Sequence, residues 1–404
     1  MTAEHFQVQV DDAVLDDLRT RLRRARWTAA AGGGLAGWRG GTDAGYLRDL
    51  CAYWADGFDW RRREAALNAL PQRRAQVGEA AVHFVHVQTE RRPSVPLLLL
   101  HGWPDSFYRF HRVIPLLSEP DVRDGDGAAA AFDLVIPSLP GFAFTGAVPV
   151  GPYQPTRQSA EILWRLMTEV LGYQRFAVAG GDGGGVLAQI LAIDHPEAII
   201  GVHLTDLGWQ ANNVDPASLS PSERHYLEAA RKSFMADGAY AMVQSTRPRT
   251  LAPALEDSPV ALASWIVDRF HAWSDPAGGD LDSRFGRDDL LTNIMIYWVT
   301  GTIGSSILNY QADARSPSLA PTDRVERPVG LALFPHEPGG VPPRRLAERT
   351  LNVQRWATMS HGGHFAAWEV PALYAREVIA FFQPLAAAER ADRRKERGDV
   401  HPAL

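Results

Sequence analysis

The chain has 404 residues, of which 46% are hydrophobic and 22% are charged, and its 41 basic and 47 acidic side chains give a net charge of −6. This balance disfavours nucleic acid and anionic membranes as partners, and the single cysteine, Cys51, excludes a disulfide framework. The sequence has neither a signal-peptide pattern nor an apolar run approaching the ~18 residues of a membrane span, so we expect a cytoplasmic protein.

Residues 1–95 precede the first strand of the expected core, and no Pro/Ser/Gly linker separates them from it. Alternating residues predict strands over 6–10 and 82–87, and leucines at helical spacing predict a helix over 14–26. Two further helices, rich in aromatic residues, are expected over 46–58 and 61–70. We interpret this region as an N-terminal cap that wraps the core.

The next part of the chain, residues 96–208, alternates short apolar runs with amphipathic segments. Strands are predicted over 95–100, 132–136, 176–179 and 199–204, and helices over 106–117, 159–171 and 186–193. Strands that alternate with helices in this way are typical of a parallel sheet in an α/β protein.

Residues 209–322 interrupt this alternation, because they are helical and aromatic and contain no convincing buried strand. We interpret them as a helical lid. The core resumes over residues 323–404, with strands over 328–334 and 353–359 and a closing helix over 371–382.

The most informative stretch runs from Gly180 to Gly184 and reads Gly-Gly-Asp-Gly-Gly. It follows a predicted strand and precedes a helix, with small residues on both sides of Asp182, as in the nucleophile elbow of hydrolases. Asp stands where Ser is commoner. A carboxylate is already ionised at neutral pH and attacks an electrophilic sp³ carbon, which forms an alkyl-enzyme ester.

A histidine and an acid follow the nucleophile in the order typical of such hydrolases. His364 lies in a glycine-confined loop after the last strand, where it would serve as the base that activates water. Glu337, after the resumed strand, would orient it. His361 is a weaker candidate for the base. Asp323 and Glu326 are alternative acids, but both precede the strand.

Two further functions can be assigned to candidate residues. The backbone N–H groups of Trp103 and Gly183 are placed to form an oxyanion hole. Tyr240 and Tyr310, in the lid, carry phenols that are protonated at neutral pH and could donate to a leaving oxygen. From composition alone, lid tyrosines serve packing as readily as catalysis.

Several motifs together resemble those of the microsomal-type epoxide hydrolases over nearly the whole chain. These motifs are His101-Gly-Trp-Pro-Asp-Ser-Phe-Tyr108, Pro137-Ser-Leu-Pro-Gly-Phe142, Gly180-Gly-Asp182, Gln244-Ser-Thr-Arg-Pro248 and Gly362-Gly-His-Phe365. The resemblance implies an α/β-hydrolase fold and epoxide hydrolysis without cofactor or metal. It places the nucleophile on Asp182, the acid on Glu337, the histidine on His364 and the ring-opening tyrosines on Tyr240 and Tyr310.

One departure from that family concerns the residue after the nucleophile, which is usually Trp and here is Gly183. We therefore expect a wider pocket beside Trp103, Pro104 and Gly183, suited to a bulky or natural-product epoxide. Two alternatives stay open, a haloalkane dehalogenase with the same Asp-ester chemistry and a non-catalytic fold that binds a hydrophobic ligand. A homodimer is also possible.

Overall fold

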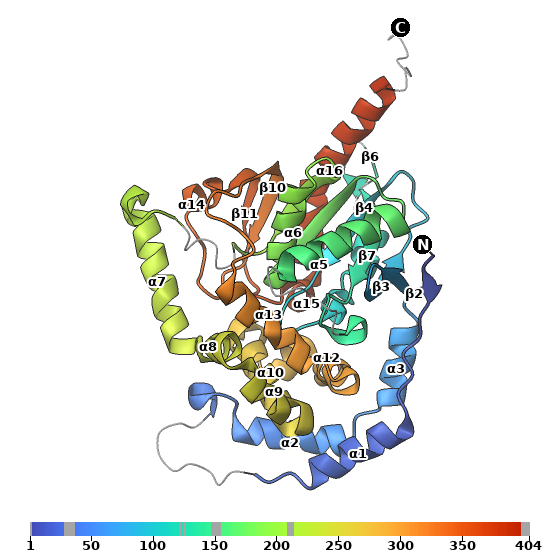
Figure 1. The fold of residues 1–404 in the computed structure, drawn as a ribbon, viewed down its shortest axis with the longest axis vertical. Coiled ribbons are helices and arrows are strands. Elements are labelled where there is room, and N and C mark those ends of the chain that lie inside the picture. The colour runs from blue at the N-terminus through green and yellow to red at the C-terminus, as the bar shows by residue number, and fades with distance from the viewer. Residues whose placement is uncertain are drawn as a thin grey trace.

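A nine-stranded sheet forms the centre of the computed structural model, which describes residues 2–27, 37–120, 123–124, 127–128, 130–146, 155–207 and 214–396 (Figure 1). The strand order is β1-β2-β3-β7-β4-β8-β9-β10-β11. The strands are β1 Glu4–His5, β2 Gln72–Val77, β3 Ala80–Val87, β4 Ser94–Leu100, β7 Ala131–Pro137, β8 Phe176–Gly180, β9 Ile199–Leu204, β10 Val325–Leu333 and β11 Leu351–Thr358. A separate two-stranded sheet pairs β5 Arg123–Asp124 with β6 Gly127–Ala128.

The strands from β7 to β11 in this order all run parallel, whereas β3, β2 and β1 extend the sheet with each strand antiparallel to its neighbour. Every residue of β7, β8 and β9 is buried. Continuous apolar runs suit strands that are covered on both faces, as the parallel-sheet prediction required. The candidate catalytic residues follow the carboxyl ends of three of the parallel strands: Asp182 follows β8, Glu337 follows β10 and His364 follows β11.

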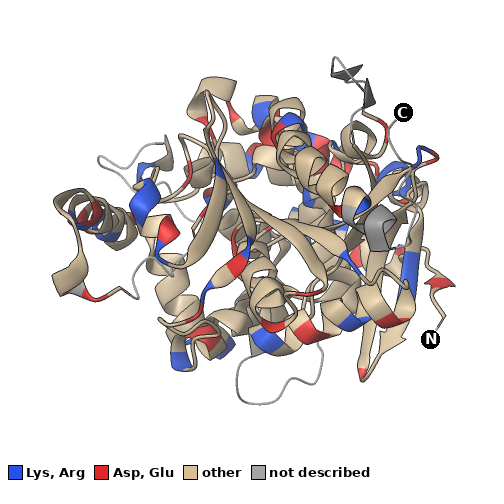
Figure 2. Ribbon diagram, turned by 90° about the horizontal axis from the view of Figure 1, so that it is seen from above, with Lys and Arg blue, Asp and Glu red and all other residues tan. Residues whose placement is uncertain are grey.

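Helices cover both faces of the sheet, with α5 and α6 in front and α16 behind in the view of Figure 1. The helices of the core are α4 Ile114–Ser118, α5 Pro155–Arg165, α6 Gly183–Asp194, α14 Arg344–Glu348, α15 Ala366–Glu369 and α16 Pro371–Glu396. Figure 2 shows that charged residues gather on the helices and loops, while the central strands carry few. Among the described residues, no helix is both long and apolar enough to span a membrane.

The described part of the chain between β9 and β10 contains helices joined by short loops and no strand. Its helices are α7 Pro221–Asp237, α8 Ala239–Thr246, α9 Pro248–Asp257, α10 Pro259–Trp273, α11 Leu281–Phe285, α12 Arg287–Thr300 and α13 Ile303–Arg315. In Figure 1, α8 to α13 lie together beyond one end of the sheet. The predicted boundary at 208–209 lies outside the described residues, so the division into a core and a lid at that position stays a prediction.

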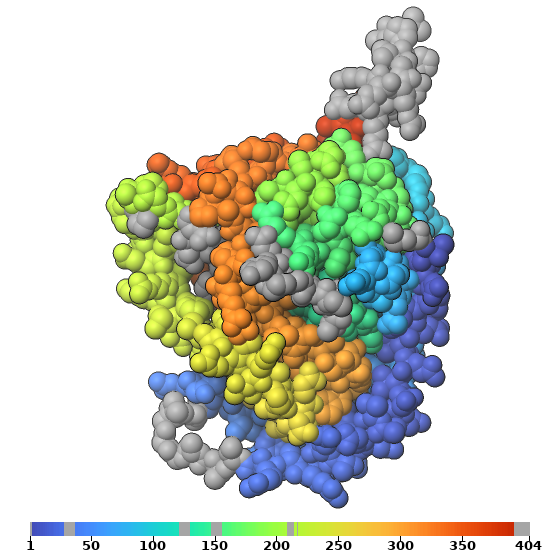
Figure 3. Space-filling view, in the orientation of Figure 1, coloured from blue at the N-terminus to red at the C-terminus, as the bar shows by residue number. Residues whose placement is uncertain are grey.

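The N-terminal helices are α1 Asp12–Arg23, α2 Ala44–Asp56 and α3 Trp60–Asn68. The hydroxyl of Tyr46 donates to Asp282 at 3.0 Å, and that of Tyr53 donates to Asp288 at 2.7 Å. Both acceptors belong to the helices between β9 and β10. The space-filling view shows this N-terminal region wrapped around the lower end and one side of the molecule (Figure 3). It therefore contacts the helices between β9 and β10 as well as the sheet.

The predicted strand over residues 6–10 is wrong. The structure forms only the two-residue β1 before it, and α3 supplies the partners of the backbone that follows. The N–H of Val8 donates to Asn68 Oδ1 at 2.7 Å, and that of Val10 donates to Glu64 Oε1 at 2.8 Å. Side-chain acceptors on a helix thus replace the ladder partner that an extended segment would otherwise need.

The predicted helix over 106–117 is also wrong in part, because the segment divides into a 3₁₀ turn, Phe107–Phe110, and the short α4. Pro115 lies in the first turn of α4, where its missing N–H costs nothing, but a helix running through it would lose a hydrogen bond. Strand β2 was not predicted, because its sequence Gln-Arg-Arg-Ala-Gln-Val is mostly polar; it forms a hairpin with β3.

Candidate active site

The nucleophile candidate lies on a strained turn between β8 and α6. Asp182 has φ +54° and ψ −135°, a backbone conformation that non-glycine residues rarely adopt and that costs about 1–3 kcal/mol. The flanking glycines permit the turn. A Cβ on Gly180 would lie 2.5 Å from the carbonyl oxygen of Gly184, and a Cβ on Gly184 would lie 2.2 Å from that of Leu100. The small residues read from the sequence are thus required by close backbone contacts.

The two carboxylate oxygens of Asp182 have different surroundings. Oδ1 accepts the N–H of Gly183 at 2.6 Å and that of Trp103 at 3.0 Å. These are the two groups predicted to form an oxyanion hole, and they hold the side chain in one orientation. Oδ2 lies 3.6 Å from Nε2 of His364. One oxygen is therefore bound by two donors, and the other faces the base candidate.

The structure brings Glu337 and His364 into direct contact. The loop after β10 pairs with the histidine loop through a parallel bridge between His336 and Gly363. Nδ1 of His364 lies 2.9 Å and 3.1 Å from the two carboxylate oxygens of Glu337. His364 is 3% exposed, and its Nε2 has no hydrogen-bond partner in the structure. An imidazole fixed at Nδ1 and free at Nε2 is arranged to take a proton from water.

The charge on His364 reflects opposing influences. Burial lowers its pKa, but the charge and hydrogen bond of Glu337, together with the charge of Asp182, outweigh this and raise the pKa to about 9. The imidazolium is therefore favoured while Asp182 is anionic. Loss of that negative charge removes one of the influences that raise the pKa.

Both candidate tyrosines lie beside the nucleophile, on different lid helices. The ring of Tyr240, from α8, stacks on Trp103 at a centroid distance of 5.5 Å, and that of Tyr310, from α13, lies 5.9 Å from Trp103. The two tyrosine rings are 6.1 Å apart. Burial is the main cause that raises the pKa of both phenols well above the usual value. The charge of Asp182 adds to the rise for Tyr240, and the phenol of Tyr240 adds to it for Tyr310. Both phenols are therefore protonated donors at neutral pH.

Trp273, at the end of α10, is a further part of this site and was not predicted. Its ring lies 5.0 Å from that of His364 and 5.1 Å from that of Tyr240, and its carbonyl oxygen accepts the N–H of His364 at 2.9 Å. The rings of Trp103 and Trp273 are also 6.4 Å apart, so the two indoles and Tyr240 form one aromatic cluster. A tryptophan in a helix carries no signal of this role without the packing of the lid.

A buried ion pair supports the histidine loop from the opposite side. Asp105 Oδ2 accepts from Nη1 of Arg109 at 2.6 Å, and Nη2 of Arg109 donates to the carbonyl oxygen of His364. Both side chains are buried. Their spacing of four residues, directly after the His-Gly-Trp-Pro motif, was a signal that sequence analysis could have used.

The rival candidates lie elsewhere. His361 is exposed and bonds to Ser360, whereas Asp323 pairs with Arg157 at 2.7 Å. Glu326 pairs with Arg324 at the surface. Among the described residues, no three His, Cys, Asp or Glu side chains are grouped as metal ligands would be.

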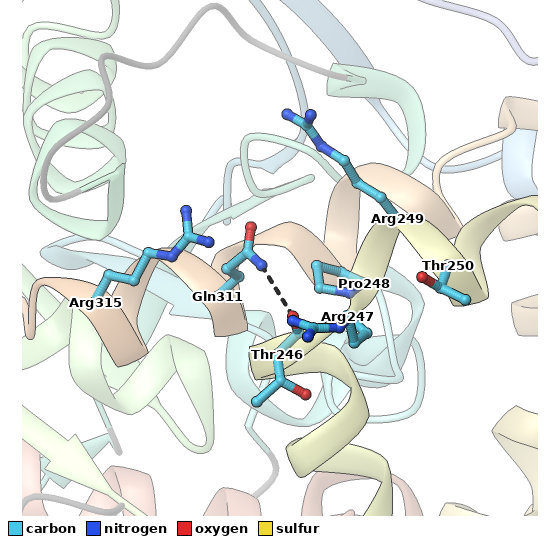
Figure 4. A pocket seen from close by; sticks show the side chains of 7 residues that line it. All are labelled: Thr246, Arg247, Pro248, Arg249, Thr250, Gln311 and Arg315. Atoms are coloured by element: carbon cyan, nitrogen blue, oxygen red, sulfur yellow. Dashed lines mark hydrogen bonds between the residues drawn. The ribbon is translucent and has the colours of Figure 1, made fainter.

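The predicted pocket comprises Trp103, Pro104 and Gly183. Trp103 and Pro104 are buried, and there is space beside Gly183, next to the nucleophile. A Cβ on Gly183 would have only the Cα of Gly102 within 4 Å, at 3.9 Å. Figure 4 shows a different hollow, of about 290 Å³, between the α8–α9 junction and α13. None of the catalytic candidates lines it. Its lining residues are Thr246, Arg247, Pro248, Arg249, Thr250, Gln311 and Arg315.

Comparison with known proteins finds related families over most of the chain. A family model for the epoxide hydrolase N terminus matches residues 3–110, and one for the alpha/beta hydrolase fold matches residues 95–295. The chain is 36% identical to a Stigmatella aurantiaca protein named as an epoxide hydrolase, with 95% of this chain and 85% of that protein covered. It is 32% identical to epoxide hydrolase 1 of Sus scrofa, with 93% and 87% covered.

The fold likewise matches a solved structure, that of juvenile hormone epoxide hydrolase from the silkworm Bombyx mori. The TM-score is 0.86 at 26% identity, with 96% of this chain and 95% of that chain covered. The predicted α/β-hydrolase fold is therefore confirmed.

Proposed function

The chain belongs to the epoxide hydrolase family of the α/β-hydrolase fold, and from this premise we propose that it opens epoxides through a covalent ester on Asp182. The observation that carries the proposal is the unequal environment of the Asp182 carboxylate. Two backbone donors bind Oδ1, while Oδ2 is left to attack. Fixing the nucleophile in this way reduces the entropy lost in reaching the transition state.

In the first step, Oδ2 of Asp182 forms a bond to one oxirane carbon, and that carbon–oxygen bond of the ring breaks. The leaving oxygen develops negative charge, which the hydroxyls of Tyr240 and Tyr310 neutralise by hydrogen bonding and proton donation. Their raised pKa values make them donors rather than anions near the nucleophile.

In the second step, His364 takes a proton from water, and the water oxygen attacks the ester carbonyl. The carbonyl oxygen is Oδ1, so the N–H groups of Trp103 and Gly183 are already in place for the developing oxyanion. Ester formation removes the charge of Asp182, which lowers the pKa of His364 and favours the neutral base. Collapse of the intermediate breaks the bond between the ester oxygen and the carbonyl carbon, and the departing oxygen takes the proton held by His364. The proton left on the new carboxyl group returns to the tyrosine pair, which restores the carboxylate of Asp182 and releases a vicinal diol.

For the substrate, we propose an apolar, bulky epoxide. The walls are aromatic, with Trp103, Trp273 and Tyr240 around the reacting centre. The missing side chain at Gly183 leaves space beside the attacked carbon that a large substituent could fill.

The experiment that tests the mechanism is intact-mass analysis of His364→Ala after incubation with alkyl, aryl and polycyclic epoxides. Without the base, the ester should accumulate, with an added mass of one whole epoxide on the peptide that carries Asp182. The matched control is the double variant with Asp182→Asn, which should gain no mass. An adduct on a different residue, or none in His364→Ala while the wild type makes diol, would contradict the covalent mechanism.

A further inference from the structure

A third carboxyl group, that of Asp206, lies at the nucleophile turn and has no part in the two steps above. Asp206 follows β9, the strand beside β8, and is buried. Its Oδ2 accepts the backbone N–H of Asp182 at 2.8 Å, and the hydroxyl of Thr205 lies 3.3 Å from the same oxygen. A Cβ on Gly181 would be 3.0 Å from this oxygen, so the glycine allows the approach.

The hydrogen bond from Asp182 to Asp206 is made by the residue whose backbone is strained. Asp182 keeps a positive φ only because its surroundings determine it, and a bond to its N–H is one of those determinants. A neutral acceptor would satisfy an N–H at lower cost, because a buried carboxyl is expensive to ionise. A buried carboxyl beside two other acids of the site is therefore placed to act through its charge as well as through its hydrogen bond.

The charged and titratable groups around Asp206 come from each element that packs against it. They are Asp182 at the elbow, Glu337 after β10, His364 on the histidine loop and Tyr226 on α7. Burial and then the charge of Glu337 raise the pKa of Asp206 to about 7, with Asp182 adding to the rise, whereas His364 and the bond to the N–H of Asp182 act in the opposite direction. Asp206 is thus in electrostatic contact with every charged member of the catalytic group.

We propose that Asp206 is a positioning residue with two effects: its oxygen holds the backbone of the nucleophile in the attacking conformation, and its charge is coupled to the proton on His364. The second effect rests on the proposed function, in which His364 must be neutral to activate water. An anionic Asp206 favours the imidazolium, so His364 loses its proton only at a higher pH.

The two effects can be separated by two substitutions. Asp206→Leu removes the acceptor, whereas Asp206→Asn keeps an acceptor oxygen of the same reach and removes the charge. Alkylation and ester hydrolysis are followed separately by rapid quench and mass analysis of single turnovers with styrene oxide, from pH 5.5 to 9.5. The folded state of each variant is checked by its thermal unfolding curve.

For Asp206→Leu we expect alkylation to slow by about ten- to a hundredfold, the loss that corresponds to one buried hydrogen bond. For Asp206→Asn we expect alkylation within about threefold of the wild type. The rate of ester hydrolysis in Asp206→Asn should equal that of the wild type below about pH 6, where Asp206 is itself neutral. As the pH rises, this rate should reach its plateau roughly half to one pH unit lower than in the wild type.

Unchanged alkylation in Asp206→Leu would overturn the positioning effect, and coincident pH profiles of Asp206→Asn and wild type would overturn the coupling to His364. Failure of the underlying mechanism would give a different result, because neither the wild type nor any variant would then form an ester at Asp182. A merely structural role would lower stability without shifting the pH profile.

Discussion

Replacement of Glu337 by Gln gives the most direct measure of what the acid contributes. The side chain keeps its size and an oxygen that can accept the Nδ1–H of His364, but it loses its charge. In the folded protein the pKa of His364 rises from 6.5 to about 9 despite burial, and Glu337 is the largest influence that raises it. That rise corresponds to about 3 kcal/mol in favour of the imidazolium.

Most of this stabilisation should disappear in Glu337→Gln, so the step that forms the imidazolium should slow by about a hundredfold. The pKa of His364 should fall by more than one unit, because burial then acts with less opposition. Alkylation by Asp182 should change little. The ester should therefore accumulate in this variant, as we also expect for His364→Ala.

The assay is a single-turnover time course with rapid quench, which records free enzyme, ester and diol at a series of pH values. The matched control is Asp323→Asn, at an acid that precedes β10 and pairs with Arg157 rather than with the histidine. Its pH profile should be that of the wild type. Wild-type ester hydrolysis and an unshifted pH profile in Glu337→Gln would refute the assignment of Glu337 as the orienting acid.

Two further predictions concern the pocket and the tyrosines. Gly183→Trp fills the space beside the nucleophile and should lower kcat/KM at least tenfold for polycyclic epoxides, while kcat/KM for small alkyl epoxides should stay within about threefold. The control is Gly185→Ala, whose Cβ would make only ordinary van der Waals contacts with Leu204 and Gly180. An equal loss for large and small substrates would contradict the pocket argument. Tyr240→Phe and Tyr310→Phe should each slow alkylation by about 10²-fold or more, with ester hydrolysis nearly unchanged in single turnovers, whereas a selective loss of the second step would reassign these phenols.

The local chemistry around Asp182 was predictable because short-range constraints determine it. Glycines on both sides of a carboxylate, between a strand and a helix, have few structural explanations, and the structure shows the close contacts that require them. The proximity of Glu337 and His364 was also predictable, since both follow carboxyl ends of parallel strands that meet at one edge of the sheet.

Other parts depend on packing between segments far apart in the chain and were not predictable. Trp273 reaches the site only because the end of α10 docks on the histidine loop. Residues 6–10 alternate like a strand, yet acceptors on α3 bind their backbone. Asp206 lies two residues after a predicted strand, but its bond to the N–H of Asp182 depends on how the neighbouring elbow packs.

The hydrogen bonds from Tyr46 and Tyr53 to the lid have a consequence for protein engineering. The segment that carries Tyr240 and Tyr310 is held between the sheet and α1–α2, so its position is set by residues more than 180 places earlier in the chain. A chimera that received only the stretch between β9 and β10 would lose these contacts with α1–α2. Exchange of substrate range between relatives by transplanting the lid should therefore succeed only when the first 70 or so residues are exchanged with it.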